Sequence, residues 1–153
     1  MNNMSYRPCV GIMLINSNGL IFSAERTDMP GAWQMPQGGV DIGEDQEQAA
    51  LRELEEETSV PHSAVRIVKR TASSVRYDFP QELLTRDGWK GKYIGQEQHW
   101  FLMELTGVEA LINIETEHPE FSRWKWSTPE ELVSEIVSFK TSVYEQVVAE
   151  LLG

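Results

Sequence analysis

The chain has 153 residues, of which 41% are hydrophobic, and this length and apolar content predict one compact domain with a packed core. No run approaches the roughly 20 apolar residues that a membrane span needs, and the N-terminus lacks the layout of a secretory signal, so we expect a cytoplasmic protein without membrane contact. The formal net charge of −11 argues against a protein that wraps duplex nucleic acid, because such proteins neutralise many phosphates with Lys and Arg.

The first forty residues are expected to form short strands separated by turns. Residues 9–15 and 20–24 are β-prone runs around the turn-forming sequence Asn16-Ser17-Asn18-Gly19, which predicts a hairpin. Residues 27–31 contain Pro and Gly and are expected to form a loop. A short strand at residues 33–35 is then expected to end at a proline and a glycine pair.

The rest of the chain predicts one central helix, several strands and two terminal helices. Residues 45–58 contain neither Gly nor Pro, and Ala49, Ala50 and Leu54 recur at helical spacing, which favours a helix of about four turns with a narrow apolar stripe. β-branched and aromatic residues indicate strands at 65–68, 75–79, 100–105 and 121–126, and helices are expected at 130–137 and 142–152. This order predicts a mixed sheet covered on both faces.

Three glutamates of the central helix form the most informative cluster. Glu53, Glu56 and Glu57 stand at i, i+3 and i+4, which places their carboxylates on one helix face. Like charges so placed destabilise an isolated helix by roughly 0.2–0.5 kcal/mol per pair. The cluster is either a solvated acidic face or a site for Mg²⁺ or Mn²⁺, which prefer carboxylate and carbonyl oxygens. Two or three such ions would cancel the charge and leave open positions for a phosphate chain.

The residues around this cluster resemble the Nudix box. The matching positions are Gly38, Glu44 six residues on, Arg52-Glu53-Leu54, Glu56-Glu57 and Val60. Ser59 stands where the family has glycine, at a helix end where a left-handed turn costs a non-glycine residue roughly 1 kcal/mol. The resemblance implies an α/β fold, the Nudix α/β/α sandwich, with a mixed β-sheet, the box (38–60) as loop–helix–loop, and one Nudix hydrolase domain over residues 1–153.

The resemblance also implies roles for the box residues. The three helix glutamates are implied metal ligands, with an oxygen from the Gly38 carbonyl. Glu44 and Arg52 are implied to pair with each other and to orient the carboxylates. Glu120 is a further candidate ligand, since the family often brings an acid from a distant loop. The candidates for the general base, which the sequence does not rank, are Glu53, Glu56 and Glu120.

Motifs outside the box extend the resemblance over nearly the whole chain. They are Tyr6-Arg7-Pro8, the run from Trp33 to Gly39, Gly95-Gln96-Glu97-Gln98 with Trp100-Phe101, Pro119-Glu120-Phe121, Trp124-Lys125-Trp126 and Val137-Ser138-Phe139-Lys140. They are similar to the bacterial branch of the family that removes pyrophosphate from 5′-triphosphorylated RNA or splits diadenosine polyphosphates. The RNA 5′ end is the favoured substrate and the diadenosine polyphosphate the alternative. A hydrolase of nucleoside triphosphates or nucleotide sugars and a non-catalytic nucleotide-sensing module are further alternatives.

Several residues of these motifs are candidate substrate contacts. Phe139 beside Lys140 offers a stacking plane next to a cation, which a base beside its phosphates would require. Arg7 and Arg26 would add positive charge, and Gln96 could form hydrogen bonds with ligand edges. Each residue also has an ordinary interpretation as core or surface. The expected substrate contacts are Arg7, Arg26, Trp33, Gln96, Val137, Phe139 and Lys140.

The cysteine and the histidines indicate no further chemistry. Cys9 is the single cysteine, which excludes an internal disulfide and a Cys-based zinc site and fits a reducing compartment. It is expected in a strand away from the box, which gives no support to isomerases that share the fold and use a cysteine acid/base. His62, His99 and His118 lack zinc spacing and a triad context. The oligomeric state stays open between monomer and homodimer.

Overall fold

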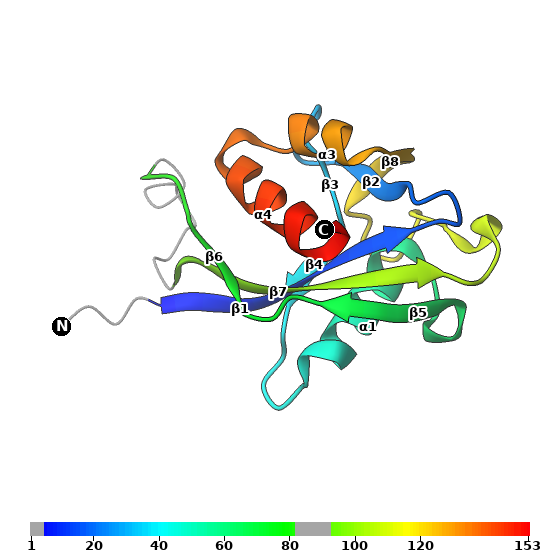
Figure 1. Ribbon diagram of the computed structural model, residues 1–153, viewed down its shortest axis with the longest axis horizontal. Coiled ribbons are helices and arrows are strands. Elements are labelled where there is room, and N and C mark those ends of the chain that lie inside the picture. The colour runs from blue at the N-terminus through cyan, green and yellow to red at the C-terminus, as the bar shows by residue number, and fades with distance from the viewer. Residues whose placement is uncertain (1–4, 82–92) are drawn as a thin grey trace.

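The computed structural model describes residues 5–81 and 93–153, and its strands form one mixed sheet (Figure 1). The main path through the sheet runs β3-β2-β1-β7-β5, while β4 pairs with β1, β6 with β7 and β8 with β2. β1 and β7 are parallel, and the other pairings are antiparallel. The strands are β1 (Ser5–Ile15), β2 (Ile21–Arg26), β3 (Trp33–Gln34), β4 (Gln37–Gly39), β5 (Val65–Arg70), β6 (Val75–Asp78), β7 (Tyr93–Leu105) and β8 (Phe121–Ser127).

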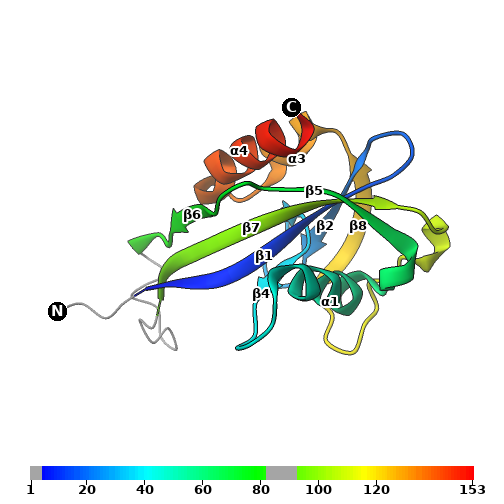
Figure 2. The same cartoon turned by 60° about the horizontal axis from the view of Figure 1, so that its bottom comes forward.

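Helices cover both faces of the sheet, which confirms the predicted α/β architecture. α1 (Gln46–Thr58) lies on one face, and α3 (Pro129–Glu135) and α4 (Thr141–Leu152) lie on the other (Figures 1 and 2). Short 3-10 turns occupy His62–Ala64, Glu109–Leu111 and Ser138–Lys140. Within the described ranges, no helix combines the length and the apolar character that crossing a bilayer requires.

Local sequence signals fix the ends of these elements. The Asn16 side chain accepts hydrogen bonds from the N–H groups of Asn18 and Leu20, both at 3.0 Å, and so closes the predicted β1–β2 hairpin. Asp45 caps α1 by accepting from the N–H of Glu47 at 2.7 Å. Thr128 forms a capping box at the start of α3, where Pro129 follows it.

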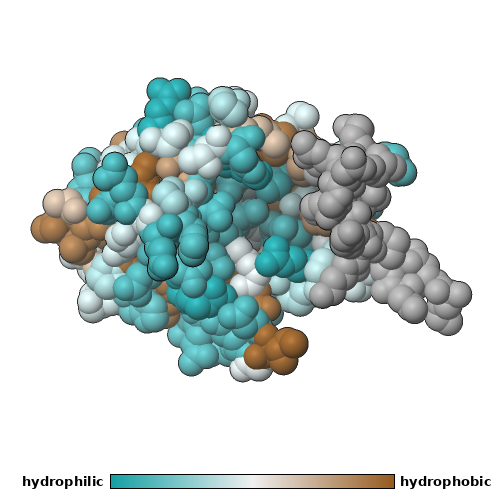
Figure 3. Space-filling view, turned by 180° about the vertical axis from the view of Figure 1, so that it is seen from behind, coloured by the Kyte–Doolittle hydropathy of each residue, from teal (hydrophilic) through white to brown (hydrophobic). Residues whose placement is uncertain are grey.

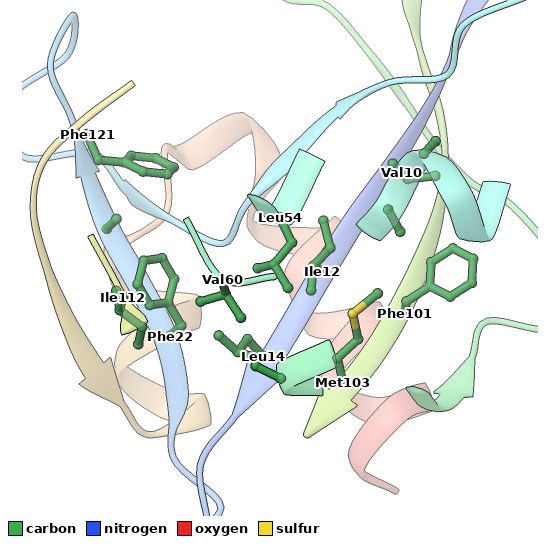
Figure 4. Close-up of a cluster of buried hydrophobic side chains, with 14 residues drawn as sticks. Val10, Ile12, Leu14, Phe22, Leu54, Val60, Phe101, Met103, Ile112 and Phe121 are labelled. Carbon is green, nitrogen blue, oxygen red and sulfur yellow. The ribbon is translucent and has the colours of Figure 1, made fainter. Parts of the chain in front are cut away.

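Alternation of side chains along the central strands divides the core into two clusters. In β1, Val10, Ile12 and Leu14 point to the face covered by α1, whereas Met13 points to the face covered by α4. The first cluster also receives the predicted stripe of α1, and Figure 4 shows Leu54 among the side chains of the sheet. Burying a leucine side chain stabilises a fold by roughly 1.5–3 kcal/mol, so this narrow stripe holds α1 in place despite its acidic face.

The structure contains one strand that the sequence did not predict. The proline and the glycine pair after residue 35 indicate a break, but Gln37–Gly39 forms β4, with Cys9 opposite Gly39 across the ladder. Backbone pairing with β1 needs no side chains, which explains why glycines form this strand. The expectation that Cys9 lies away from the box is therefore wrong. Its thiol is buried, and burial raises its pKa to about 11.

Candidate active site

α1 and β4 together position the first carboxylate. Leu54 anchors α1 in the core, so its neighbour Glu53 lies against the backbone of β4. A Cβ atom at Gly38 would collide with the Glu53 carboxyl group, and one at Gly39 would collide with the guanidinium group of Arg7. Glycines at these two positions let the carboxyl group of Glu53 and the guanidinium group of Arg7 approach β4 from different sides.

Arg52 ties the box loop to the helix. Its guanidinium group holds both oxygens of Glu44, at 2.8 and 2.9 Å, and contacts Glu53 at 2.9 Å and Glu56 at 3.2 Å. It also donates to the Gly39 carbonyl at 2.9 Å. Glu44 accepts from the N–H of Asp41, and the bonds to Arg52 and to this N–H lower the pKa of Glu44 to about 2. The structure thus contains the Glu44–Arg52 pair that the resemblance implies.

Glu53 and Glu57 form a buried acidic pair. Glu57 is only 6% exposed, and the two carboxyl groups are joined by a hydrogen bond. Burial raises the pKa of Glu53, and burial together with the neighbouring charges of Glu53 and Glu120 raises that of Glu57 well above its usual value. Two carboxyls in hydrogen-bond contact require a proton between them when no cation is present. A divalent cation would neutralise this charge instead, so the donor set fits a hard metal ion.

An acidic cavity of about 630 Å³ extends from this pair. Its lining residues are Glu53, Glu55, Glu56, Glu57, Ser59, Thr116, Glu117, His118 and Glu120. Glu120 enters from the loop before β8, where its carbonyl accepts from the N–H of Thr27 at 3.0 Å. The Glu56 side chain is 57% exposed and bonded to Arg52. Among the described residues, no three acidic, cysteine or histidine side chains are already grouped as a cation site.

A basic pocket, also of about 630 Å³, is lined by a different set of residues from the acidic cavity. Its lining residues are Arg7, Arg26, Asp28, Met29, Gln37, Tyr77, Phe79, Tyr93, Gln96, Phe139 and Lys140. A connecting cavity of about 250 Å³ shares Arg7, Arg26 and Gln96 with the basic pocket, and it shares Glu53, Glu57 and Glu120 with the acidic cavity. We call these three adjoining cavities together the track, with carboxylates along one end and cationic side chains along the other.

Aromatic rings form the apolar part of the basic pocket. Phe139 and Tyr77 lie with ring centroids 6.0 Å apart, and the ammonium nitrogen of Lys140 is 5.5 Å from the Tyr77 ring centroid. Lys140 is only 4% exposed, and burial together with the nearby Arg26 lowers its pKa to about 8. The pocket thus places a buried cation beside two aromatic rings.

The structure brings five of the seven expected substrate contacts to this pocket and leaves two outside. Trp33 and Val137 line a separate cavity of about 460 Å³, and the Trp33 ring lies 4.4 Å from the ammonium nitrogen of Lys125 and 5.1 Å from the guanidinium carbon of Arg123. The sequence reasoning missed Tyr77, which lines the pocket. The only signal for it was the alternation of the β-prone run that contains it.

Seen from behind, the surface over the middle of the molecule is mainly hydrophilic, and hydrophobic residues are scattered over it (Figure 3). Ile42 of the box loop is fully exposed. A polar face of this kind suits a highly charged ligand better than an apolar one.

Comparison with known proteins gives one consistent family. A family model described as NUDIX domain matches residues 5–147. The RNA pyrophosphohydrolase of Cereibacter sphaeroides is 54% identical over 147 residues, which cover 95% of this chain and 90% of the relative. The RNA pyrophosphohydrolase of Erythrobacter litoralis is 52% identical over 151 residues, which cover 97% of this chain and 92% of that relative.

Solved structures share the fold at lower identity. The E. coli dihydroneopterin triphosphate pyrophosphohydrolase has a TM-score of 0.74 and 20% identity, with 95% of this chain and 98% of that chain covered. A C. elegans Ap4A hydrolase in a binary complex has a TM-score of 0.66 and 20% identity, with the same coverage of both chains. At this identity the likeness concerns the fold alone.

Proposed function

Because the chain belongs to the Nudix hydrolase family, we propose that it removes pyrophosphate from the 5′-triphosphate end of RNA by attack of water at phosphorus. The observation that carries the proposal is the track that joins the acidic cavity to the basic pocket through the connecting cavity. It offers a site for cations, a passage for phosphates and a pocket for a base. The two relatives that are 54% and 52% identical to this chain are both named RNA pyrophosphohydrolase.

Nudix hydrolases generally use divalent metal. We assign Mg²⁺ or Mn²⁺, as two or three ions, to Glu53, Glu56, Glu57 and Glu120 with the Gly38 carbonyl. Bound metal would activate water and stabilise the charge that develops on the phosphates. Arg52 would keep Glu53 oriented once the Glu53–Glu57 proton is lost, because it already holds that carboxylate at 2.9 Å.

The chain's own side chains supply the remaining steps. The carboxylates of Glu53, Glu56 and Glu120 are the groups placed to accept the proton of the attacking water, since all three line the acidic cavity. Arg7 and Arg26 lie along the connecting cavity and would bind phosphate oxygens. The first bases of the RNA would then lie near Phe139 and Tyr77.

Diadenosine polyphosphates are the second candidate substrate, since they too consist of a polyphosphate chain that bears a base. A product assay with Mg²⁺ separates the candidates by comparing triphosphorylated RNA, diadenosine tetraphosphate, ADP-ribose and nucleoside triphosphates by kcat/KM. We expect the RNA to be the best substrate. A preference for any of the other three would contradict the proposal.

Removal of one carboxylate tests the site itself. Glu53→Gln and Glu56→Gln should each lower turnover by orders of magnitude while circular dichroism shows an intact fold, because each removes a ligand or a base. Glu47→Gln is the matched control, since it makes the same change on the exposed first turn of α1 and should leave turnover unchanged. Full activity in both site variants would rule out this site.

A further inference from the structure

The basic pocket contains a negative charge that its proposed role does not require. Among the described residues that line it, Arg7, Arg26 and Lys140 are cationic, and Asp28 is the single acidic side chain. A pocket that only had to attract phosphates would gain from having no carboxylate there. The position of Asp28 therefore needs an explanation.

The carboxylate of Asp28 binds the Nε–Nη2 edge of the Arg26 guanidinium group, where a phosphate could otherwise bind. The Arg26 Nε atom lies 2.8 Å from one Asp28 oxygen, and the Nη2 atom lies 2.7 Å from the other. These are two parallel bonds from neighbouring donors, the geometry in which arginine also binds phosphate. A phosphate that uses this edge of Arg26 must first displace the carboxylate.

The pair lies where a ligand can reach it. The Asp28 side chain is 66% exposed and that of Arg26 28% exposed, and Arg26 also lines the connecting cavity. The loop that carries Asp28 is held at its base, because Glu25 accepts from the N–H of Gly31 at 2.7 Å and the Arg26 N–H donates to Ala32 at 3.0 Å. The chain thus keeps the carboxylate tethered near the guanidinium group at a high effective concentration.

We propose that Asp28 is an internal counter-anion that competes with the phosphates of the substrate for Arg26, and so lowers the affinity of the basic pocket and speeds release of the product. The inference rests on the proposed function, in which Arg26 binds the polyphosphate. A triphosphate end with several anionic oxygens displaces the carboxylate more readily than the monophosphate end that remains after cleavage. Asp28 would therefore favour exchange of product for substrate.

The central test removes the charge and keeps the shape. In Asp28→Asn, the Kd for a short 5′-triphosphorylated RNA should fall by about twofold to fivefold, as expected for an exposed ion pair. The inhibition constant of the 5′-monophosphate product should fall as well, and kcat should not rise. Glu145→Gln is the matched control, because it makes the same change in net charge on α4 at an exposed residue outside the basic pocket.

A double-mutant cycle shows whether the effect acts through Arg26. In the Arg26→Gln background, Asp28→Asn should no longer tighten binding, because the competition has no target. An unchanged or weaker affinity in the single Asp28→Asn variant would overturn the proposal, and so would an equal gain in both backgrounds. Measuring the cycle by calorimetry with inorganic tripolyphosphate as well keeps it independent of turnover. Failure to hydrolyse triphosphorylated RNA would then refute the proposed function without deciding the role of Asp28.

Discussion

Lys140 lines the basic pocket, and the burial of its charged side chain lowers the stability of the fold. Its side chain is buried beside Tyr77, and within the described parts of the chain it forms no ion pair with a carboxylate. Burying a charge without a partner is unfavourable, which is why its pKa is lowered to about 8. The polyphosphate ligand that we propose would supply the missing negative charge.

Replacement of Lys140 by methionine should therefore stabilise the protein and weaken substrate binding. Below pH 8 the lysine is charged in both states, so the wild type carries the full cost, up to about 3 kcal/mol for a shift of this size. Between pH 8 and 10.5 only the unfolded state keeps the proton, so wild-type stability rises with pH. Urea denaturation at pH 7 and pH 10 should show a gain for Lys140→Met that shrinks at the higher pH.

Binding measurements on the same variant separate the basic pocket from the metal site. Lys140→Met, like Phe139→Ala, should raise KM for triphosphorylated RNA and leave Mg²⁺ binding unchanged, because both residues line the basic pocket and not the acidic cavity. A fall in metal affinity would show that these residues act at the other end of the track.

At the C-terminal end of α1, Ser59 stands where the family has glycine, and a hydrogen bond from its side chain compensates for the backbone strain. Ser59 adopts the left-handed conformation, with φ of 68°, as its position in the box predicts. Its hydroxyl donates to the Asn113 carbonyl at 2.7 Å, and the Asn113 N–H donates to the Thr58 carbonyl at 2.8 Å. The serine side chain thus adds a second bond between α1 and the loop that leads to Glu120.

Two substitutions at Ser59 separate backbone strain from this hydrogen bond. Ser59→Gly removes strain of about 1 kcal/mol and loses a bond of about 1 kcal/mol, so its free energy of unfolding should stay within about 1 kcal/mol of the wild type. Ser59→Ala loses the bond and keeps the strain, and should be less stable by about 1 kcal/mol. Urea denaturation with a constant m-value is the measurement. Equal stability of the two variants would mean that the left-handed conformation carries no strain, and equal stability of Ser59→Ala and the wild type would mean that the hydroxyl contributes nothing.

Elements were predictable from the sequence where local spacing decides the structure. The spacing that predicts the central helix is local, and the helix is present as α1, with Asp45 as its cap and not within it. β4 was missed because it depends on pairing with β1, 26 or more residues earlier in the chain. The same pairing brings Cys9 to the box. Trp33 and Val137 line a cavity apart from the basic pocket, because a motif shows that residues recur together but not which cavity they line, and their contact with substrate stays a prediction.

Over the whole molecule, acidic residues outnumber basic ones, but basic residues gather in the basic pocket. The chain has 24 acidic and 13 basic residues, yet three of the basic ones line one pocket. The net charge of −11 therefore repels the body of an RNA, while the track attracts its 5′ end. This arrangement favours recognition of an end over binding along the chain.

The salt dependence of RNA binding should reflect this division. Each phosphate neutralised on a single strand contributes roughly −0.7 to the slope of log K against log salt, so contacts from Arg7, Arg26 and Lys140 predict a slope of about −2. Arg26→Gln should make the slope less steep by about 0.7. Lengthening the RNA beyond the first few nucleotides should not raise the affinity, because the added phosphates meet an acidic surface that repels them. A much steeper slope, or an affinity that grows with RNA length, would require a second cationic surface beyond the basic pocket.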